Sequence, residues 1–291
     1  MAKLVLGDCM AKVYRKHRYH GVKYIFREIG RRLVSVSRLL AFALVGLYVL
    51  IPWLLPLEDG GRIILTGMAI VSALTAFMWQ KKAVKIAGKM DIVAAGHDGE
   101  GVVAKELAEL PRPWAVLNNL ALRVNGPIVQ IDHIVISPTA VHVLETKAQK
   151  GKIIPRSQGA WQVQRRGSTR SIVNPVEQNR AQVQACRQLL AKLGVSVPCL
   201  GRVVMTESST QAKWPITQVE SLVQALLDHD AQHQPQMDAQ EIRDLAKSLL
   251  QFQVSGRAPW QQGREDFARF ALLVLLPLLG YGLILAILLW L

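Results

Sequence analysis

Cysteine is scarce in this chain of 291 residues, which holds only Cys9, Cys186 and Cys199. No two of them are spaced as a CxxC pair, so the sequence indicates neither a zinc site nor a disulfide framework. Acidic residues are also few, with 21 Asp and Glu against 35 Lys and Arg and a formal net charge of +14. An excess of this size favours an anionic partner, either nucleic acid or a membrane surface.

Charged residues are absent from three apolar stretches, at residues 39–57, 63–79 and 270–291. Each stretch approaches or reaches the roughly 20 residues that a helix needs to span a bilayer. We therefore expect a transmembrane hairpin at 39–80, with a polar turn at 58–62, and a C-terminal span at 270–291. A cleaved signal peptide is a poor interpretation, because the preceding basic stretch is long and no small-residue cleavage site follows closely.

The basic residues around these stretches predict their orientation. Residues 1–38 carry ten Lys and Arg against two acids, and further Lys and Arg follow the second stretch and precede the third. The positive-inside rule then places the N-terminus and the middle of the chain in the cytoplasm and the C-terminus on the opposite side. We expect a multi-pass protein of a bacterial inner membrane, with segment 1–38 against anionic lipid headgroups. Buried core helices are the alternative interpretation of the apolar stretches.

Residues 90–260 differ in kind, because they mix charges, turns and short apolar periods and hold no spanning stretch. Asp98 is the expected N-cap of the first helix in this region. Periodicity predicts helices at 98–110, 174–193 and most of 215–253, with a break at 232–236, and strands at 114–124, 151–163 and 200–205. This order indicates one mixed α/β domain of normal size.

Two runs rich in Ile and Val make residues 129–147 the most informative segment. The four residues between them, 137–140, have turn chemistry, which predicts a β-hairpin. Counting back from that turn places Asp132 opposite Glu145, and Lys147 shares the strand face of Glu145. Like charges directly across a sheet are destabilising, so a divalent cation between the two carboxylates would relieve them.

Such a hairpin is suited to metal-assisted hydrolysis of phosphodiesters. Asp132, Glu145 and the backbone carbonyl of Thr146 offer the hard oxygens that Mg²⁺ or Mn²⁺ prefers. A bound metal polarises a phosphate and acidifies a water nucleophile. Lys147 is placed to stabilise the developing charge or orient that water, and Glu100, early on the preceding helix, is expected to approach the same site.

The segment after Lys147 is basic and free of acids as far as residue 170. We expect a hairpin tip at Gly167–Ser168 in its midst. Six of its side chains are expected to contact nucleic-acid phosphates: Lys150, Lys152, Arg156, Arg165, Arg166 and Arg170. A solvated basic loop, or one near anionic lipid, is the alternative interpretation.

Short motifs occur in a set order along the same region: Gly99-Glu100, Gln130-Ile131-Asp132-His133, Leu144-Glu145-Thr146-Lys147, Gly151, Trp161 and Asn174-Pro175-Val176-Glu177-Gln178. Together they resemble a nuclease-related domain (NERD) protein, a branch of the PD-(D/E)xK nuclease superfamily, over about residues 96–206. One departure is visible at Ala148, where the family often has Asn.

The resemblance implies a restriction-endonuclease-like α/β fold, a mixed sheet flanked by helices, in addition to the three transmembrane helices. It also implies that Asp132 and Glu145 bind the metal and that Lys147 assists catalysis. Glu100 would support the site, and Gln178 would be the family's helix glutamine near it.

These observations predict a membrane-anchored, cytoplasm-facing, metal-dependent nuclease that acts on DNA, with its nuclease domain at residues 90–260. The alternative is a catalytically degenerate nuclease fold that binds DNA or acts as a scaffold in a membrane assembly for transfer or defence. The expected partners are DNA, a bilayer with anionic headgroups, and further copies of the chain or other assembly subunits. A channel is disfavoured, because the apolar stretches lack intramembrane charge.

Overall fold

The computed structural model describes residues 11–13, 59–123, 128–156, 158–208 and 215–254, with the isolated positions 35, 39, 46, 50 and 272. The chain divides into two compact units. The first comprises Met1–Tyr19 and Ala95–Gly256, and the second His20–Ala94 and Arg257–Leu291. The first unit contains the sheet and the predicted site.

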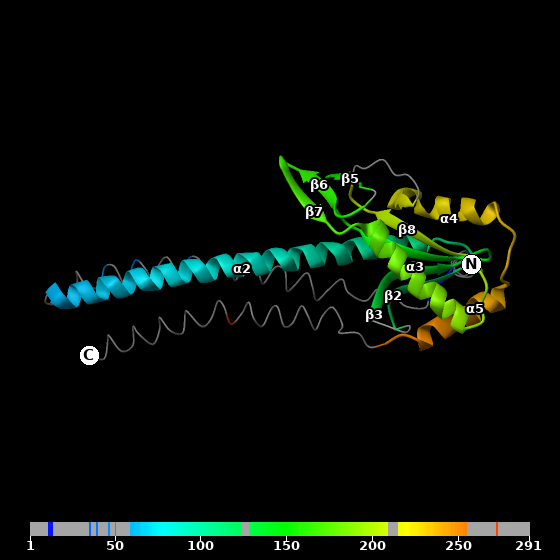
Figure 1. Cartoon of the computed structure of the whole chain (residues 1–291), viewed down its shortest axis with the longest axis horizontal. Coiled ribbons are helices and arrows are strands. Elements are labelled where there is room, and N and C mark those ends of the chain that lie inside the picture. Colours follow the sequence, from blue (N-terminus) through cyan, green and yellow to red (C-terminus); the bar gives the residue numbers. More distant parts are fainter. Residues whose placement is uncertain are drawn as a thin grey trace, which may run out of the picture. The chain divides into compact units, whose positions relative to one another are not determined.

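A six-stranded mixed sheet forms the centre of the first unit, in the order β1-β2-β3-β4-β8-β9. Figure 1 labels β2, β3 and β8 of this sheet. Strands β2, β3 and β4 pair in antiparallel fashion, whereas β1 with β2, β4 with β8, and β8 with β9 are parallel pairs. The strands are β1 (Lys12–Val13), β2 (Ala115–Arg123), β3 (Ile128–Ile136), β4 (Val141–Lys147), β8 (Cys199–Met205) and β9 (Ile216–Gln218). The prediction of a mixed α/β fold with a multi-stranded sheet flanked by helices is confirmed.

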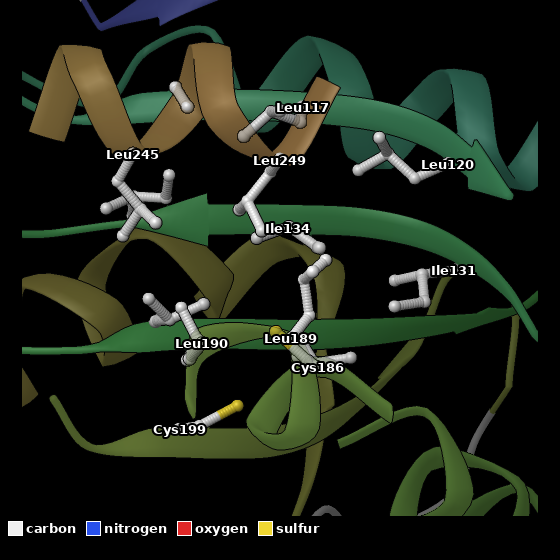
Figure 2. Close-up of a cluster of buried hydrophobic side chains, with 14 of the residues drawn as sticks. Leu117, Leu120, Ile131, Ile134, Cys186, Leu189, Leu190, Cys199, Leu245 and Leu249 are labelled. Atoms are coloured by element: carbon white, nitrogen blue, oxygen red, sulfur yellow. The ribbon is translucent and has the colours of Figure 1, made fainter. Parts of the chain in front are cut away.

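One face of the sheet is covered by α3 (Pro175–Lys192) and α5 (Ala239–Gln251). Strand residues Leu117, Leu120, Ile131 and Ile134 are fully buried there against helix residues such as Leu189, Leu190, Leu245 and Leu249 (Figure 2). Leu117 and Leu120, and likewise Ile131 and Ile134, are three residues apart, so the regular alternation of a strand is interrupted between them. On β2 the interruption includes Asn119, which has a φ of 59°, and on β3 it includes Asp132.

The opposite face packs against the C-terminal part of α2 and against α4 (Leu222–Ala231). Val135 and Leu144 from the sheet contact a second cluster that includes Val103, Leu107 and Leu226. His133 belongs to this face and lies 2.7 Å from Asn118 through Nδ1 and Oδ1.

A smaller three-stranded sheet follows β4 in the chain, formed by β5 (Lys152–Ile154), β6 (Trp161–Arg165) and β7 (Ser168–Ile172). Trp161 and Val163 are buried against Val203 and Met205 of β8. The β6–β7 turn has positive φ at Arg166 and Gly167, at 48° and 77°. This is the pattern of a two-residue type I′ hairpin, and it lies one residue before the predicted tip.

Helix α2 (Asp59–Leu107) is far longer than the helix predicted at 98–110. Asp98 is inside it, so the prediction of an N-cap there is wrong, and residues 59–62 of the predicted turn at 58–62 form its first turn. The physical reason is that no proline occurs between Pro56 and Pro111. Gly96 and Gly99 suggest a break, but a helical glycine costs only about 1 kcal/mol relative to alanine.

In the described part of the chain, none of the helices combines the length and apolar character needed to cross a bilayer. The predicted spans at 39–57 and 270–291 fall almost wholly outside the described residues, and the predicted span at 63–79 lies within α2. The structure therefore gives no support to the three predicted transmembrane helices.

Three further elements were not predicted. Strand β1 lies within the basic segment 1–38 and pairs with the start of β2, where the Lys12 amide donates to the Trp114 carbonyl at 3.0 Å. Residues 216–221 form β9 and a 3₁₀ turn, η2 (Val219–Ser221), where helix was expected. The polar break predicted at 232–236 does separate α4 from α5.

Candidate active site

The β3–β4 ladder ends one position before the two predicted carboxylates. Its register is as predicted, and its last pair is His133 opposite Leu144. Continuing that register brings Asp132 opposite Glu145, where the strands no longer pair. Instead, the Thr146 amide donates to Oδ2 of Asp132 at 2.8 Å. We call this opening between residues 130–132 of β3 and 145–147 of β4 the fork.

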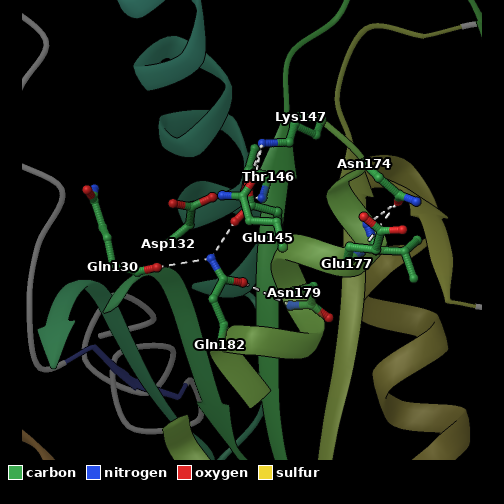
Figure 3. Close-up of polar contacts among 11 residues, drawn as sticks. Gln130, Asp132, Glu145, Thr146, Lys147, Asn174, Glu177, Asn179 and Gln182 are labelled. Atoms are coloured by element: carbon green, nitrogen blue, oxygen red, sulfur yellow. Dashed lines mark hydrogen bonds and ion pairs between the residues drawn. The ribbon is translucent and has the colours of Figure 1, made fainter. Parts of the chain in front are cut away.

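Glu145 is 2% exposed, and both of its carboxylate oxygens accept hydrogen bonds (Figure 3). Oε1 accepts from the Lys147 ammonium, and Oε2 accepts from Nε2 of Gln182 at 2.6 Å. The same Lys147 ammonium donates to Oε1 of Gln178 at 3.0 Å. The structure thus brings the predicted residues Glu145, Lys147 and Gln178 into direct contact, two from β4 and one from the first turns of α3.

Asp132 is held among other carboxylates. Burial raises its pKa well above the usual range, and the charges of Glu145 and Glu100 raise the pKa further. The Thr146 amide and the Lys147 ammonium act in the opposite direction but do not reverse the shift. Ionised Asp132 therefore needs more positive charge than these donors supply, and a hard divalent cation provides it. The oxygens at the fork fit Mg²⁺ or Mn²⁺ on this ground.

Glu100 carries the third carboxylate and comes from α2. It is buried, and its Oε2 lies 3.1 Å from Nδ1 of His97, one turn earlier on the same helix. Gly99 explains how the helix approaches the end of β4 so closely. A Cβ at position 99 would lie only 2.6 Å from the Cβ of Ala148, so any side chain there would force α2 away.

Among the residues that the structure describes, no group of three or more His, Cys, Asp and Glu side chains is arranged to hold a metal ion. Mg²⁺ does not need such a group, because it keeps several waters and is commonly bound by one or two carboxylates. Asp132 and Glu145 meet this smaller requirement. The backbone carbonyl of Thr146 stays the predicted third ligand.

Every side chain predicted to contact nucleic acid is exposed, and all six lie between the end of β4 and β7: Lys150, Lys152, Arg156, Arg165, Arg166 and Arg170. Lys150 also forms an ion pair with Glu207 at 3.0 Å. Arg165 and Arg166 lie at the tip of the β6–β7 hairpin, and Arg170 lies on β7 opposite Val163 of β6. These basic side chains are therefore concentrated in residues 150–170, which follow the fork along the chain. We call this segment the basic ribbon.

Two contacts to the acidic residues were missed from the sequence. His97 lies next to Glu100, and Gln182 donates to Glu145. Gln182 carries a signal that sequence reasoning passed over, because it follows Gln178 by four residues and therefore shares its face of α3. His97 likewise precedes Glu100 by three residues on one helix, but the long extent of α2 was not foreseen.

Comparison with known proteins selects the segment that contains the fork. Residues 95–206 match the model of the nuclease-related domain family, NERD. Over 108 residues the chain is 34% identical to an uncharacterized protein of Bacillus anthracis, an alignment that covers 36% of this chain and 50% of that relative. The chain thus spans about half the length of the curated relative that it matches. No solved structure matches the chain.

The predicted NERD resemblance is confirmed for residues 95–206, and it indicates a nuclease-related function. The matched range contains the five residues to which the sequence assigned catalytic or supporting roles: Glu100, Asp132, Glu145, Lys147 and Gln178. It also contains Gln182 and the basic ribbon. The transmembrane helices that were predicted with the resemblance lie outside this match.

Proposed function

We propose that the NERD segment is a metal-dependent nuclease that hydrolyses phosphodiester bonds of DNA, built on a restriction-endonuclease-like fold. The observation that carries this proposal is the fork itself. Asp132, Glu145 and Lys147 converge there, and the charge of Glu100 acts on Asp132. A simple surface ion pair between Glu145 and Lys147 would be exposed and would not have two further carboxylates around it.

Asp132 and Glu145 are the residues that would hold Mg²⁺ or Mn²⁺, with the Thr146 carbonyl as a further ligand. When bound, such an ion polarises the scissile phosphate and lowers the pKa of a coordinated water. Glu100 approaches from α2 with its carboxylate fixed by His97 and supports the charge of the site. These roles depend on the residues of the fork and on the close approach of α2 at Gly99.

Lys147 supplies the positive charge of the protein at this centre. Its ammonium is held between Glu145 and Gln178, which limits the rotamers that a long lysine side chain would otherwise sample. An ammonium preorganised in this way stabilises negative charge that develops on a phosphate oxygen, or orients the attacking water. Gln178 acts through Lys147 and is a positioning residue.

The exposed basic side chains that follow the fork along the chain support a nucleic-acid substrate, for which we propose DNA. Arg165, Arg166 and Arg170 would contact backbone phosphates, which gives binding that depends on salt and not on sequence. RNA cleavage in place of DNA cleavage is an outcome that the assay below distinguishes.

The membrane location is a separate proposal that rests mainly on the sequence. The basic N-terminal segment and the apolar stretches would keep the nuclease domain at the cytoplasmic face of a bacterial inner membrane. There it would contact anionic lipid and either further copies of the chain or other subunits of a membrane assembly. Large apolar side chains exposed on α2 support an apolar partner: Ile63, Ile70, Leu74, Phe77 and Met78. Recovery of the expressed chain in the soluble fraction, and not with membranes, would overturn this proposal.

Cleavage assays with purified full-length protein test the proposed activity. The substrates are circular, linear and single-stranded DNA and a matched RNA, each with Mg²⁺, with Mn²⁺ or with a chelator. We expect Glu145→Gln and Lys147→Met, which keep side-chain size but remove charge, to slow cleavage by about 100-fold or more. Asp228→Asn, exposed on α4, is the matched control and should keep the wild-type rate. Equal rates for wild type and Glu145→Gln would overturn the proposal.

A further inference from the structure

The fork leaves backbone polar groups of β3 and β4 without partners in the ladder. Buried backbone groups nearly always find another partner. On one side, Asp132 accepts the Thr146 amide with its side chain. On the other side, Gln182 Nε2 donates to the Gln130 carbonyl at 3.0 Å (Figure 3). A glutamine from α3 therefore takes the place that a strand would otherwise occupy.

The Gln182 amide has no spare hydrogen. Its two N–H groups point to the Gln130 carbonyl and to Oε2 of Glu145, both of which can only accept. Its own oxygen accepts from Nδ2 of Asn179 at 3.2 Å. A flipped amide would place an oxygen against two acceptors, so the network fixes the orientation of Gln182.

Asn179 connects this amide to the centre of the sheet. Its Nδ2 donates both to Gln182 and to the Val143 carbonyl of β4 at 3.0 Å. Gly201 of β8 leaves the space for it, because a Cβ there would lie 2.2 Å from Oδ1 of Asn179. The two amides are buried, with exposed fractions of 2% for Gln182 and 4% for Asn179.

We infer that Gln182, supported by Asn179, is the positioning residue of the fork. It spans the opening between β3 and β4 and fixes Oε2 of Glu145 relative to both strands, so that the carboxylate has one orientation when a metal binds. Only this consequence for the metal rests on the proposed function. The hydrogen-bonded network itself is a property of the protein without any ligand.

The physical reason for the effect is that Glu145 has few other constraints. The Lys147 ammonium, its partner at Oε1, is shared with Gln178, and Gln182 is the donor to Oε2. Removing the Gln182 amide would leave Oε2 of the buried Glu145 without this donor and would release the Gln130 carbonyl, which favours a rearranged fork. Residues that orient a metal ligand from behind typically change metal affinity by 10- to 100-fold when they are replaced.

The first test needs only the wild-type chain. In protein labelled with ¹⁵N-glutamine, we expect the Gln182 side-chain amide protons to exchange with water about tenfold or more slowly than those of Gln184. Gln184 is the matched reference because it lies on the same helix and is exposed. Exchange of Gln182 as fast as Gln184 would overturn the inference, whatever the protein does to DNA.

The second test is a calorimetric titration with Mn²⁺ alone. We expect Gln182→Met, which keeps the length of the side chain but loses both donors, to weaken Mn²⁺ binding by about 10- to 100-fold. Gln184→Met should bind Mn²⁺ like the wild type. Unchanged affinity in Gln182→Met would refute the positioning role.

The two proposals fail in different ways. A wild-type protein that binds Mn²⁺ but cuts no nucleic acid contradicts the proposed function and leaves the Mn²⁺ comparison intact. A wild-type protein that cuts DNA while Gln182→Met keeps full Mn²⁺ affinity contradicts the role of Gln182 alone. If Gln182→Met does not fold, slow exchange in the wild type still supports the network and fast exchange still overturns it.

Discussion

Asp132 is costly to ionise in the metal-free protein, because it is buried beside Glu145 and Glu100. Its pKa is higher in the folded protein than in the unfolded chain, so the folded state keeps this proton to a higher pH. The protonated Asp132 carboxyl stabilises the fold fully at a pH below its pKa in the unfolded chain. This stabilisation is lost as the pH rises through the higher pKa that the carboxyl has in the folded protein. Near neutral pH the bare site therefore weakens the fold that carries it.

We expect Asp132→Asn to raise the thermal midpoint of the metal-free protein at pH 7 and to flatten its decline with rising pH. The amide keeps the size of the side chain and an oxygen for the Thr146 amide, but it removes the charge. Circular dichroism melts between pH 4 and pH 8 in a chelator measure the effect, with Asp228→Asn as the exposed control. A lower thermal midpoint for Asp132→Asn than for the wild type at pH 7 would contradict the claim that the ionised Asp132 destabilises the metal-free protein.

His142 is a second buried titratable group, on the opposite face of the sheet. Its ring stacks on Trp114 at a centroid distance of 6.4 Å and meets the edge of His229 at 5.2 Å. Burial lowers the pKa of His142 from 6.5 to about 3, with His229 and Arg202 acting in the same direction. The unfolded chain binds this proton first as the pH falls, so stability is lost from about pH 6.5 down to about pH 3.

His142→Phe should therefore make the protein less sensitive to acid. The phenyl ring keeps the stacking on Trp114 and cannot be protonated, so we expect the midpoint to fall less between pH 7 and pH 5 than in the wild type. His233→Phe, exposed after α4, serves as the control. Identical acid sensitivity of His142→Phe and wild type would show that groups other than His142 cause the loss of stability at low pH.

At the scale of elements, α3 determines how accurately the fork is built. It carries both Gln178 and Gln182, and its first turn is fixed by the Asn174 side chain. That side chain accepts from the amides of Val176 at 3.0 Å and Glu177 at 3.4 Å, with Pro175 at the first helical position. This start of the helix was predicted from Asn-Pro, and it is confirmed.

Loss of this cap should weaken the whole domain. We expect Asn174→Ala to lower the free energy of unfolding by about 1 kcal/mol, because two helix amides lose their acceptor. Asn174→Asp, which keeps an acceptor oxygen, should be close to the wild type. Urea denaturation measures both variants, and equal stability of the alanine variant would contradict a capping role.

The elements that were predicted well are those whose signals are local. The β3–β4 hairpin followed from alternating apolar residues and the turn at 137–140, and its register placed Asp132, Glu145 and Lys147 together. Helix α2 was misjudged because Gly96 and Gly99 suggested a break, whereas the helix continues through both glycines in a stretch without proline. Strand β1 was missed because two residues give no periodicity.

The remaining parts of the site depend on contacts between distant segments. Gln182 meets Glu145 across 37 positions of the chain, and Asn179 meets Val143 across 36. Helical spacing can show that Gln178 and Gln182 share a face, but not that this face lies over the fork. That placement comes from the apolar contacts of α3 with the sheet, such as those of Val183 and Leu189.

At the scale of the whole molecule, the NERD segment lies within the first compact unit, and the net charge of +14 is spread beyond it. Ten of the basic residues precede residue 39, outside the matched segment. We therefore propose nucleic-acid cleavage for the fork and the basic segment after it, and membrane contact for the N-terminal charge. The two roles can be tested separately.

The most direct test of the central claim is the rate of Mg²⁺-dependent cleavage of supercoiled plasmid by the wild type and by Asp132→Asn. The comparison is decisive because the variant is expected to fold at least as stably as the wild type. We predict that the wild type cuts with Mg²⁺ or Mn²⁺ and not in a chelator. We predict that Asp132→Asn cuts more slowly than the wild type by a factor of about 100 or more. Equal cleavage by both proteins, or no cleavage by the wild type with either metal, would contradict the account.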